Sequence, residues 1–173
     1  MGTRILISAG EASGDLLAAE LLARLKQLRP GVTAVGIGGD ALREQGMEVL
    51  VPAADLAVVG LTEVLGKLPV VLGTLGKVKR CLSAGDVDLV VLVDFPDFNL
   101  RVASMAGALG IPVVYYVSPQ VWAWRRGRLR TIARRADHML TLLPFEPALY
   151  EAEGLPVTHV GPPLVDRVDA LSA

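Results

Sequence analysis

Two carboxylates and a carboxamide lie close together in one short segment, Asp94-Phe95-Pro96-Asp97-Phe98-Asn99. The segment directly follows residues 88–93, an almost entirely apolar run that is typical of a strand buried on both faces of a parallel sheet. A carboxylate at the mouth of such a sheet can accept the proton of a hydroxyl group, so one of the two acids is a candidate general base. We also expect Asp94 and Asn99 to contact a substrate. The alternative is structural: Asp97 would cap a following helix, and Asp94 would accept hydrogen bonds from loop amides.

A loop of small residues from Ser8 to Asp15 is the second candidate, because it opens a segment with helical periodicity. The free N–H groups and the dipole of a helix N-terminus favour an anion or a sugar hydroxyl. We expect ligand contacts from Glu11, Ser13 and Gly14. The loop lacks the GxGxxG spacing of a dinucleotide-binding motif. Capping of the helix by Ser13 or Asp15 is the simpler alternative for those two residues.

Both tryptophans of the chain fall in a third segment, residues 115–125, which several arginines follow. Aromatic faces together with amide and guanidinium donors suit a sugar and its phosphate. In the competing interpretation Trp122 belongs to the core and the arginines form a solvated helix face. The residues that we expect to contact a ligand here are Ser118, Gln120, Trp122, Trp124 and Arg125.

Residues 58–72 form an apolar stretch that Lys77, Lys79 and Arg80 follow. Apolar side chains flanked by cations are typical of a surface that dips into an anionic lipid leaflet. Burial against a sheet explains part of the same pattern. If the segment docks on a membrane, the residues that we expect to do so are Val64, Leu65, Leu68, Val71 and Leu72.

The composition excludes several classes of protein. Seventeen basic and 18 acidic residues give a net charge of -1, which provides no overall field to attract nucleic acid. The single Cys81 excludes a disulfide framework within the chain and suits a reducing compartment. His138 and His159 have no partner at metal-ligand spacing, so we predict neither a metal nor a cofactor. Because no apolar run reaches the roughly 18 to 20 residues of a membrane span, we expect a cytoplasmic protein.

Strand-like and helix-like segments alternate along the whole chain, which predicts an α/β fold with a doubly wound parallel sheet and right-handed crossovers. A hydrophobic content of 52% with only 5% aromatic residues is typical of such a domain. In this fold ligands bind beyond the carboxyl ends of the strands, where the loops described above should lie. We expect strands at 4–8, 33–37, 48–51, 88–93, 111–117, 138–142 and 157–160, and helices at 16–28, 41–45, 69–82, 100–109, 126–135 and from Pro144.

Six segments, in order and spacing, resemble the lipid-A-disaccharide synthase family: SAGEASGD (8–15), GIGG (36–39), VGLTEVL (59–65), DFPDFN (94–99), YVSPQVWAWR (116–125) and LPFE (143–146). The resemblance covers essentially all of this chain but only about the first half of the family's usual length. It implies the Rossmann-like, acceptor-side N-terminal domain of a GT-B glycosyltransferase, spanning residues 1–160. Residues 161–173 would begin a linker to a C-terminal nucleotide-binding domain that this sequence lacks.

The resemblance also implies a reaction. The family joins UDP-2,3-diacylglucosamine to 2,3-diacylglucosamine 1-phosphate, with inversion and without a metal, on the cytoplasmic surface of the inner membrane. Inversion requires one base, for which Asp97 is our choice. We expect this chain alone to be inactive. The family's Gly-His-Pro reads Gly161-Pro162-Pro163 here, which puts a role of that loop in doubt. The alternatives are a non-catalytic sugar-phosphate or nucleotide-binding module, and a fragment that merely pairs with a missing partner.

Overall fold

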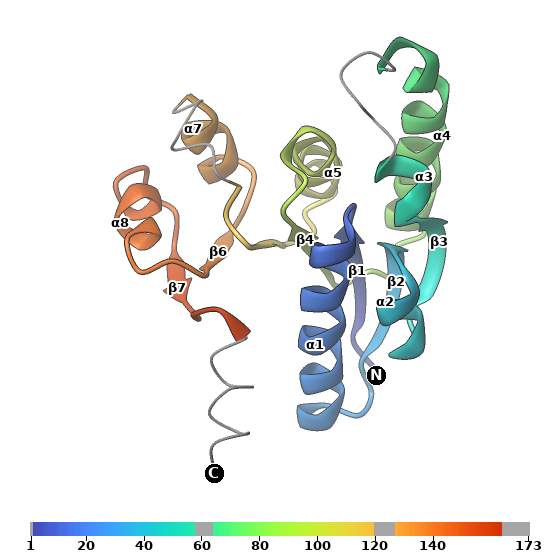
Figure 1. The fold of residues 1–173 in the computed structure, drawn as a ribbon, viewed down its shortest axis with the longest axis horizontal. Coiled ribbons are helices and arrows are strands. Elements are labelled where there is room, and N and C mark those ends of the chain that lie inside the picture. The colour runs from blue at the N-terminus through green and yellow to red at the C-terminus, as the bar shows by residue number, and fades with distance from the viewer. Residues whose placement is uncertain (1, 58–63, 120–126, 164–173) are drawn as a thin grey trace.

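The computed structural model describes residues 2–57, 64–119 and 127–163. Within them, seven parallel strands form one sheet in the order β3-β2-β1-β4-β5-β6-β7 (Figure 1). The chain winds outward in one direction from β1 and in the other from β4. The predicted doubly wound α/β fold is therefore confirmed. The strands are β1 (Arg4–Ala9), β2 (Thr33–Gly38), β3 (Glu48–Pro52), β4 (Leu89–Val93), β5 (Val113–Tyr116), β6 (His138–Thr141) and β7 (Val157–His159).

Helices cover both faces of the sheet, as the two separate apolar clusters show. One cluster packs under α1 and α2, and the other under α4, α5, α7 and α8. The described helices are α1 (Ala12–Leu28), α2 (Asp40–Glu44), α3 (Ala53–Ala57), α4 (Val64–Ser83), α5 (Pro96–Ala108), α7 (Gly127–Ala133) and α8 (Glu146–Glu151).

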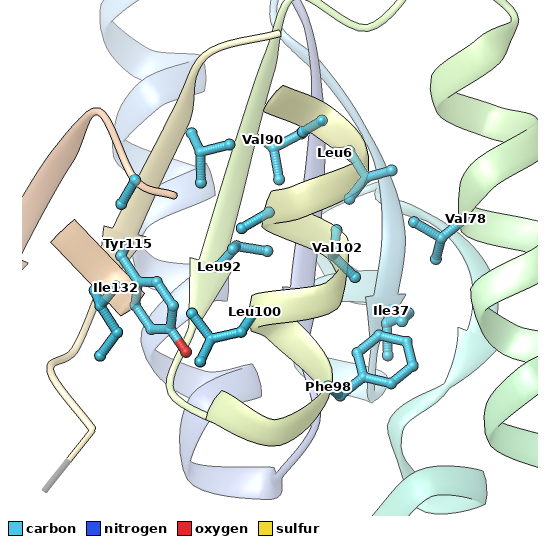
Figure 2. Packing of buried hydrophobic residues seen from close by; sticks show 14 of the residues in the cluster. Leu6, Ile37, Val78, Val90, Leu92, Phe98, Leu100, Val102, Tyr115 and Ile132 are labelled. Atoms are coloured by element: carbon cyan, nitrogen blue, oxygen red, sulfur yellow. The ribbon is translucent and has the colours of Figure 1, made fainter. Parts of the chain in front are cut away.

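The central strands are buried on both sides because their side chains alternate between the two clusters. In β4, Val90 and Leu92 join the cluster under α5, whereas Val91 and Val93 join the cluster under α1. Figure 2 shows side chains of the sheet packed against α5, which contributes the fully buried Val102. This arrangement accounts for the continuous apolar run that the sequence shows before Asp94.

Three helices begin several residues earlier than expected. The helix predicted at 16–28 begins at Ala12, so Ser13, Gly14 and Asp15 lie in its first turn and not in a loop. The helix predicted at 69–82 begins at Val64, so Pro69 lies inside it. The helix predicted at 100–109 begins at Pro96, because proline has the backbone angle of a first helical residue and its missing N–H needs no partner there. As a consequence, Asp97 and Asn99 lie in the first turn of α5 and not in a loop. The short helix α3 was not expected.

Candidate functional site

The strand order reverses between β1 and β4, which makes their carboxyl ends the switch point where this fold type binds ligands. Among the described residues, three other than glycine have positive φ angles, and all three lie just after β4 or β5: Asp94 (45°), Phe95 (47°) and Val117 (68°). Such strained backbone occurs where the surrounding structure holds it in place, and it concentrates at functional sites. The switch point is therefore our candidate site.

Asn99 is fully buried beneath this turn. Its amide nitrogen donates hydrogen bonds to the backbone carbonyls of Ser8 (3.3 Å), Val93 (3.2 Å) and Asp94 (2.8 Å). Its side-chain oxygen accepts a hydrogen bond of 2.6 Å from the Ser8 hydroxyl. The structure thus places Asn99, which we predicted to contact a substrate, with its carboxamide bonded to the protein itself.

Asp94 is half-buried where β4 ends. Burial raises the pKa of its carboxyl group because the charged form loses hydration. The negative charge of Glu11 raises this pKa further, and a hydrogen bond from the Phe95 backbone acts in the opposite direction. The buried Tyr115 hydroxyl donates a hydrogen bond of 2.7 Å to the Asp94 carbonyl. A carboxyl group with a raised pKa, beside a second acid, has the properties of a general acid or base.

Asp97 is exposed: its side chain retains 79% of its accessible surface. It forms an ion pair with Arg128 of α7, whose side chain is only 24% exposed. The N-cap position of α5 belongs to Phe95, which makes no capping hydrogen bond, so Asp97 lies within the first turn and is not the cap that we considered. A carboxylate near a helix N-terminus is favoured by the helix dipole. Asp97 is therefore both held by a cation and open to a ligand.

The small-residue loop lies beside this turn. Glu11 and Ser13 are exposed, whereas Gly14 is buried against Val93 of β4. A Cβ atom on Gly10 would lie 2.5 Å from the ring of Phe95, so the loop approaches the turn closely enough to require a glycine. Glu11 occupies the N-cap position of α1 but makes no capping hydrogen bond with its side chain.

Asp15 caps a helix other than its own. Its buried carboxylate accepts hydrogen bonds from the backbone N–H groups of Gly39 (2.6 Å), Ala41 (3.0 Å) and Leu42 (3.4 Å). The acid that opens α1 thereby fixes the loop between β2 and α2. Capping was one of the two interpretations of Asp15, but α2 was not the expected helix.

Ser118 lies beyond β5 and is buried. Its hydroxyl is 2.8 Å from the hydroxyl of Tyr150 in α8. Burial raises the pKa of Tyr150 to about 12, although the hydrogen bond from Ser118 acts against this and the Glu146 carboxylate adds to it. The other ligand contacts predicted in this segment, Gln120, Trp122, Trp124 and Arg125, lie outside the described residues.

The apolar segment on α4 is divided between surface and core. Leu68 and Leu72 are 48% and 54% exposed, and the neighbouring Val70 is 43% exposed. Val71 instead packs against the core cluster under α4 and α5. Val64 and Leu65 belong to α4, but their side chains lie outside the described part. In that part, no helix has the length and apolar character needed to cross a membrane.

Possible metal ligands and hollows in the described part of the chain lie elsewhere or do not gather. Among the described residues, no three His, Cys, Asp or Glu side chains gather in a way that could hold a metal ion. A hollow lies elsewhere, next to Arg4 at the start of β1, and Lys77, Arg80 and Asp86 help to line it. Its thiol, Cys81, has a pKa raised chiefly by burial, which favours an unreactive thiol.

Some residues of the site were not found from the sequence. Arg128 belongs to the arginine series already noted, but nothing local indicates that it pairs with an acid 31 residues away. Nothing local indicates the hydrogen bonds of Tyr115 and Tyr150 either. Tyr115 of β5 contacts the Asp94 carbonyl at the end of the neighbouring strand β4, and Tyr150 contacts Ser118 from α8, so both contacts depend on the tertiary structure.

Comparisons with known proteins agree with this architecture. A family model described as LpxB, lipid-A-disaccharide synthetase, matches residues 5–172. The chain is 53% identical over 164 residues to a lipid-A-disaccharide synthase of Anaeromyxobacter sp. (strain K), covering 95% of this chain and 43% of that protein. It is 50% identical over 165 residues to the synthase of Myxococcus xanthus, again with 43% of that protein covered. The chain thus spans less than half the length of these curated relatives.

Solved structures share the fold at low sequence identity. A UDP-GlcNAc 2-epimerase from Neisseria meningitidis, bound to UDP-GlcNAc, has a TM-score of 0.64 and 12% identity, covering 96% of this chain and 47% of that one. A UGT transferase from Siraitia grosvenorii, in complex with UDP, has a TM-score of 0.57 and 13% identity, covering 92% and 51%. At these identities the likeness shows a common fold only.

Proposed function

The chain belongs to the lipid-A-disaccharide synthase family, and from this premise we propose that it is the acceptor-side part of an inverting glycosyltransferase. The reaction would join UDP-2,3-diacylglucosamine to 2,3-diacylglucosamine 1-phosphate and release UDP. The observation that carries the proposal is the pair of acids at the switch point: Asp94 is half-buried next to Glu11, and Asp97 is exposed and paired with Arg128.

The proposed chemistry needs one proton acceptor. The acceptor hydroxyl oxygen attacks the anomeric carbon of the donor, the bond from that carbon to the UDP oxygen breaks, and the hydroxyl proton passes to a carboxylate. Asp97 is our choice for this base, since it is open to solvent and Arg128 orients it. The raised pKa of Asp94 supports the other acid as the competing candidate, because a general base works best when its pKa lies near the working pH.

A chimaera tests the assignment of the base. Residues 1–160 would replace the matching region of the Anaeromyxobacter relative, and disaccharide formation would be measured for the chimaera and for two variants, Asp97→Asn and Asp94→Asn. We expect Asp97→Asn to lower kcat by about 100-fold or more with little change in KM. Asp40→Asn is the control, because Asp40 is exposed in α2.

A large loss in Asp94→Asn together with near-normal turnover in Asp97→Asn would move the base to Asp94. Normal turnover in both variants would refute base catalysis by this motif. The chain by itself should show negligible turnover, because it spans less than half the length of its relatives and nucleotide binding would fall to the remainder of such a protein. Robust disaccharide formation by the purified 173-residue chain would contradict that part of the proposal.

Binding distinguishes this function from a non-catalytic module. In calorimetric titrations of the chain, we expect heat of binding from the acylated sugar phosphate. Binding of FMN without binding of the acylated sugar would favour a flavodoxin-like binding module. No heat of binding with the acylated sugar phosphate, FMN or UDP would favour the third alternative, a fragment that merely pairs with a partner.

We further propose that the exposed side of α4 docks on the cytoplasmic surface of the inner membrane, where the acyl chains of both substrates lie. Leu68 and Leu72, which are four residues apart and therefore lie on one side of the helix, would enter the leaflet, and Lys79, further along the same side, would contact anionic headgroups. Val71 is excluded from this surface because it packs inward.

Flotation with anionic liposomes tests the docking. A double change of Leu68 and Leu72 to Ser should reduce the bound fraction strongly. The matched control changes two other exposed leucines to Ser: Leu28, which ends α1 and is 80% exposed, and Leu109, which directly follows α5 and is 49% exposed. Equal flotation of the wild type and the Leu68 and Leu72 double variant would rule out docking through α4.

A further inference from the structure

The turn between β4 and α5 holds two consecutive residues, Asp94 and Phe95, with φ angles of 45° and 47°. Residues with a Cβ atom avoid this left-handed region because the side chain crowds the following carbonyl. Neither residue is glycine, so contacts outside the turn must compensate for the strain. The direction of the Asp94 side chain depends on those contacts.

Asn99 provides the contacts from below. It is completely buried, and its shortest bond as a donor, 2.8 Å, goes to the Asp94 carbonyl within the strained turn. The same amide bonds to the carbonyls of Ser8 and Val93, so one side chain connects the ends of β1 and β4. Ser8, also fully buried, returns a 2.6 Å hydrogen bond to the Asn99 oxygen.

We propose that Asn99 is a positioning residue, whose carboxamide holds the left-handed turn at Asp94 and Phe95 and thereby sets the direction of the acids above it. The inference rests on the proposed function, in which one of those acids accepts the proton of the acceptor hydroxyl. Asn99 itself touches no substrate in this scheme.

The residue type is specific to this task. An aspartate at position 99 could accept from Ser8 but could not donate to three carbonyls when ionised. A glutamine carries one more methylene group, which a site with no free surface cannot take without displacement. An alanine would leave the Ser8 hydroxyl and the strand-end carbonyls without this partner.

Carboxyl NMR of the chain separates positioning from mere stabilisation. In the wild type, Asp94 should titrate above an ordinary aspartate, because it is half-buried and the Glu11 carboxylate lies nearby. In Asn99→Ala we expect the turn to relax, Asp94 to gain water, and its titration midpoint to fall toward the ordinary value. Ser8→Ala, which removes one of the four bonds, should shift the midpoint in the same direction by less.

Val102→Ala is the control, because Val102 is fully buried on the same helix but does not take part in the hydrogen bonds of the turn. It should lower thermal stability and leave the Asp94 midpoint unchanged. If Asn99→Ala unfolds, the Ser8→Ala shift decides. Asp94 midpoints that stay at the wild-type value in every folded variant would overturn the inference.

In the chimaera described above, Asn99→Ala should lower kcat about tenfold or more at nearly constant KM, as expected when reacting groups are misplaced. The two proposals can fail separately. If Asn99→Ala shifts the Asp94 midpoint but the unmutated chimaera has no transferase activity, only the proposed function is refuted. If the unmutated chimaera is active but Asn99→Ala leaves both the midpoint and the activity unchanged, only the positioning role is refuted.

Discussion

Removing the Asp15 carboxylate should destabilise the chain by far more than removing a neighbouring surface acid. Asp15 is 5% exposed and accepts hydrogen bonds from the N–H groups of Gly39, Ala41 and Leu42. In Asp15→Ala these donors lose a charged partner. The contact at 3.4 Å is weak, and Gly39 and Ala41 are partly accessible to water, so the loss lies below the full value of three buried bonds.

The magnitude follows from the two short bonds. A hydrogen bond to a charged group contributes about 1.5 to 3 kcal/mol, and partial access of water reduces the sum to about 2 to 3 kcal/mol. For a chain of this size, 1 kcal/mol shifts the melting temperature by about 2 to 4 °C, so we expect a fall of roughly 5 to 10 °C. Thermal and urea unfolding followed by circular dichroism measure both quantities.

Asp40→Ala is the matched control. Asp40 lies in the first turn of the same helix α2, and its side chain is 88% exposed and pairs with Arg43. An exposed pair of this kind contributes about 0 to 1 kcal/mol, so the control should melt close to the wild type. Melting temperatures of the two variants that agree within about 2 °C would refute the interpretation of Asp15 as a buried cap.

Three more predictions concern the glycines and the tyrosines. Gly36→Ala should abolish folding by circular dichroism, because φ is +148° and an added Cβ would overlap the carbonyl oxygen of Ile7; a folded variant would contradict the close approach of β1 and β2. Gly76→Ala in α4 should raise stability to urea by about 1 kcal/mol, since no atom lies within 4 Å of the new Cβ; a loss would mean that this face is covered. Burial raises the pKa of all three tyrosines in the folded chain, that of Tyr150 to about 12. The free energy of unfolding should therefore be unaffected by these groups below about pH 10, the ordinary tyrosine value, and should fall as the pH rises from there through the raised pKa values. Ultraviolet titration should therefore detect phenolate at a higher pH in the folded chain than in urea, and coincident titration curves in the two conditions would refute this. The tyrosines are Tyr115, Tyr116 and Tyr150.

Much of the fold was predictable because local pattern encodes it. The apolar run at 88–93 predicted a strand buried on both faces, which is β4, and the alternation of segments predicted a doubly wound parallel sheet. The start of α5 was misplaced, because the helical periodicity after Asn99 is clearer than the signal of Pro96 as a first helical residue.

The location of the candidate acids was also predictable, since ligands in this fold gather where strands end, and the acids of one motif follow β4 directly. The contacts that each side chain makes there could not be predicted. Asn99 has the same residue type whether it faces a ligand or the interior. Its burial and its hydrogen bonds, among them the one with Ser8, 91 residues away, separate these roles. The pairing of Asp97 with Arg128 and the pKa of Asp94 are likewise set by neighbours from other elements.

The sequence by itself thus determined most of the strands and helices and their assembly into a parallel sheet, and it proposed an edge of that sheet for the chemistry, because hydrophobic periodicity and turn residues act over a few positions. Only the tertiary structure decided which polar side chains point outward and which support the turn from below. Hydrogen bonds and burial depend on the distance between atoms in space, and winding the chain outward from β1 and β4 brings residues together that are far apart in the sequence.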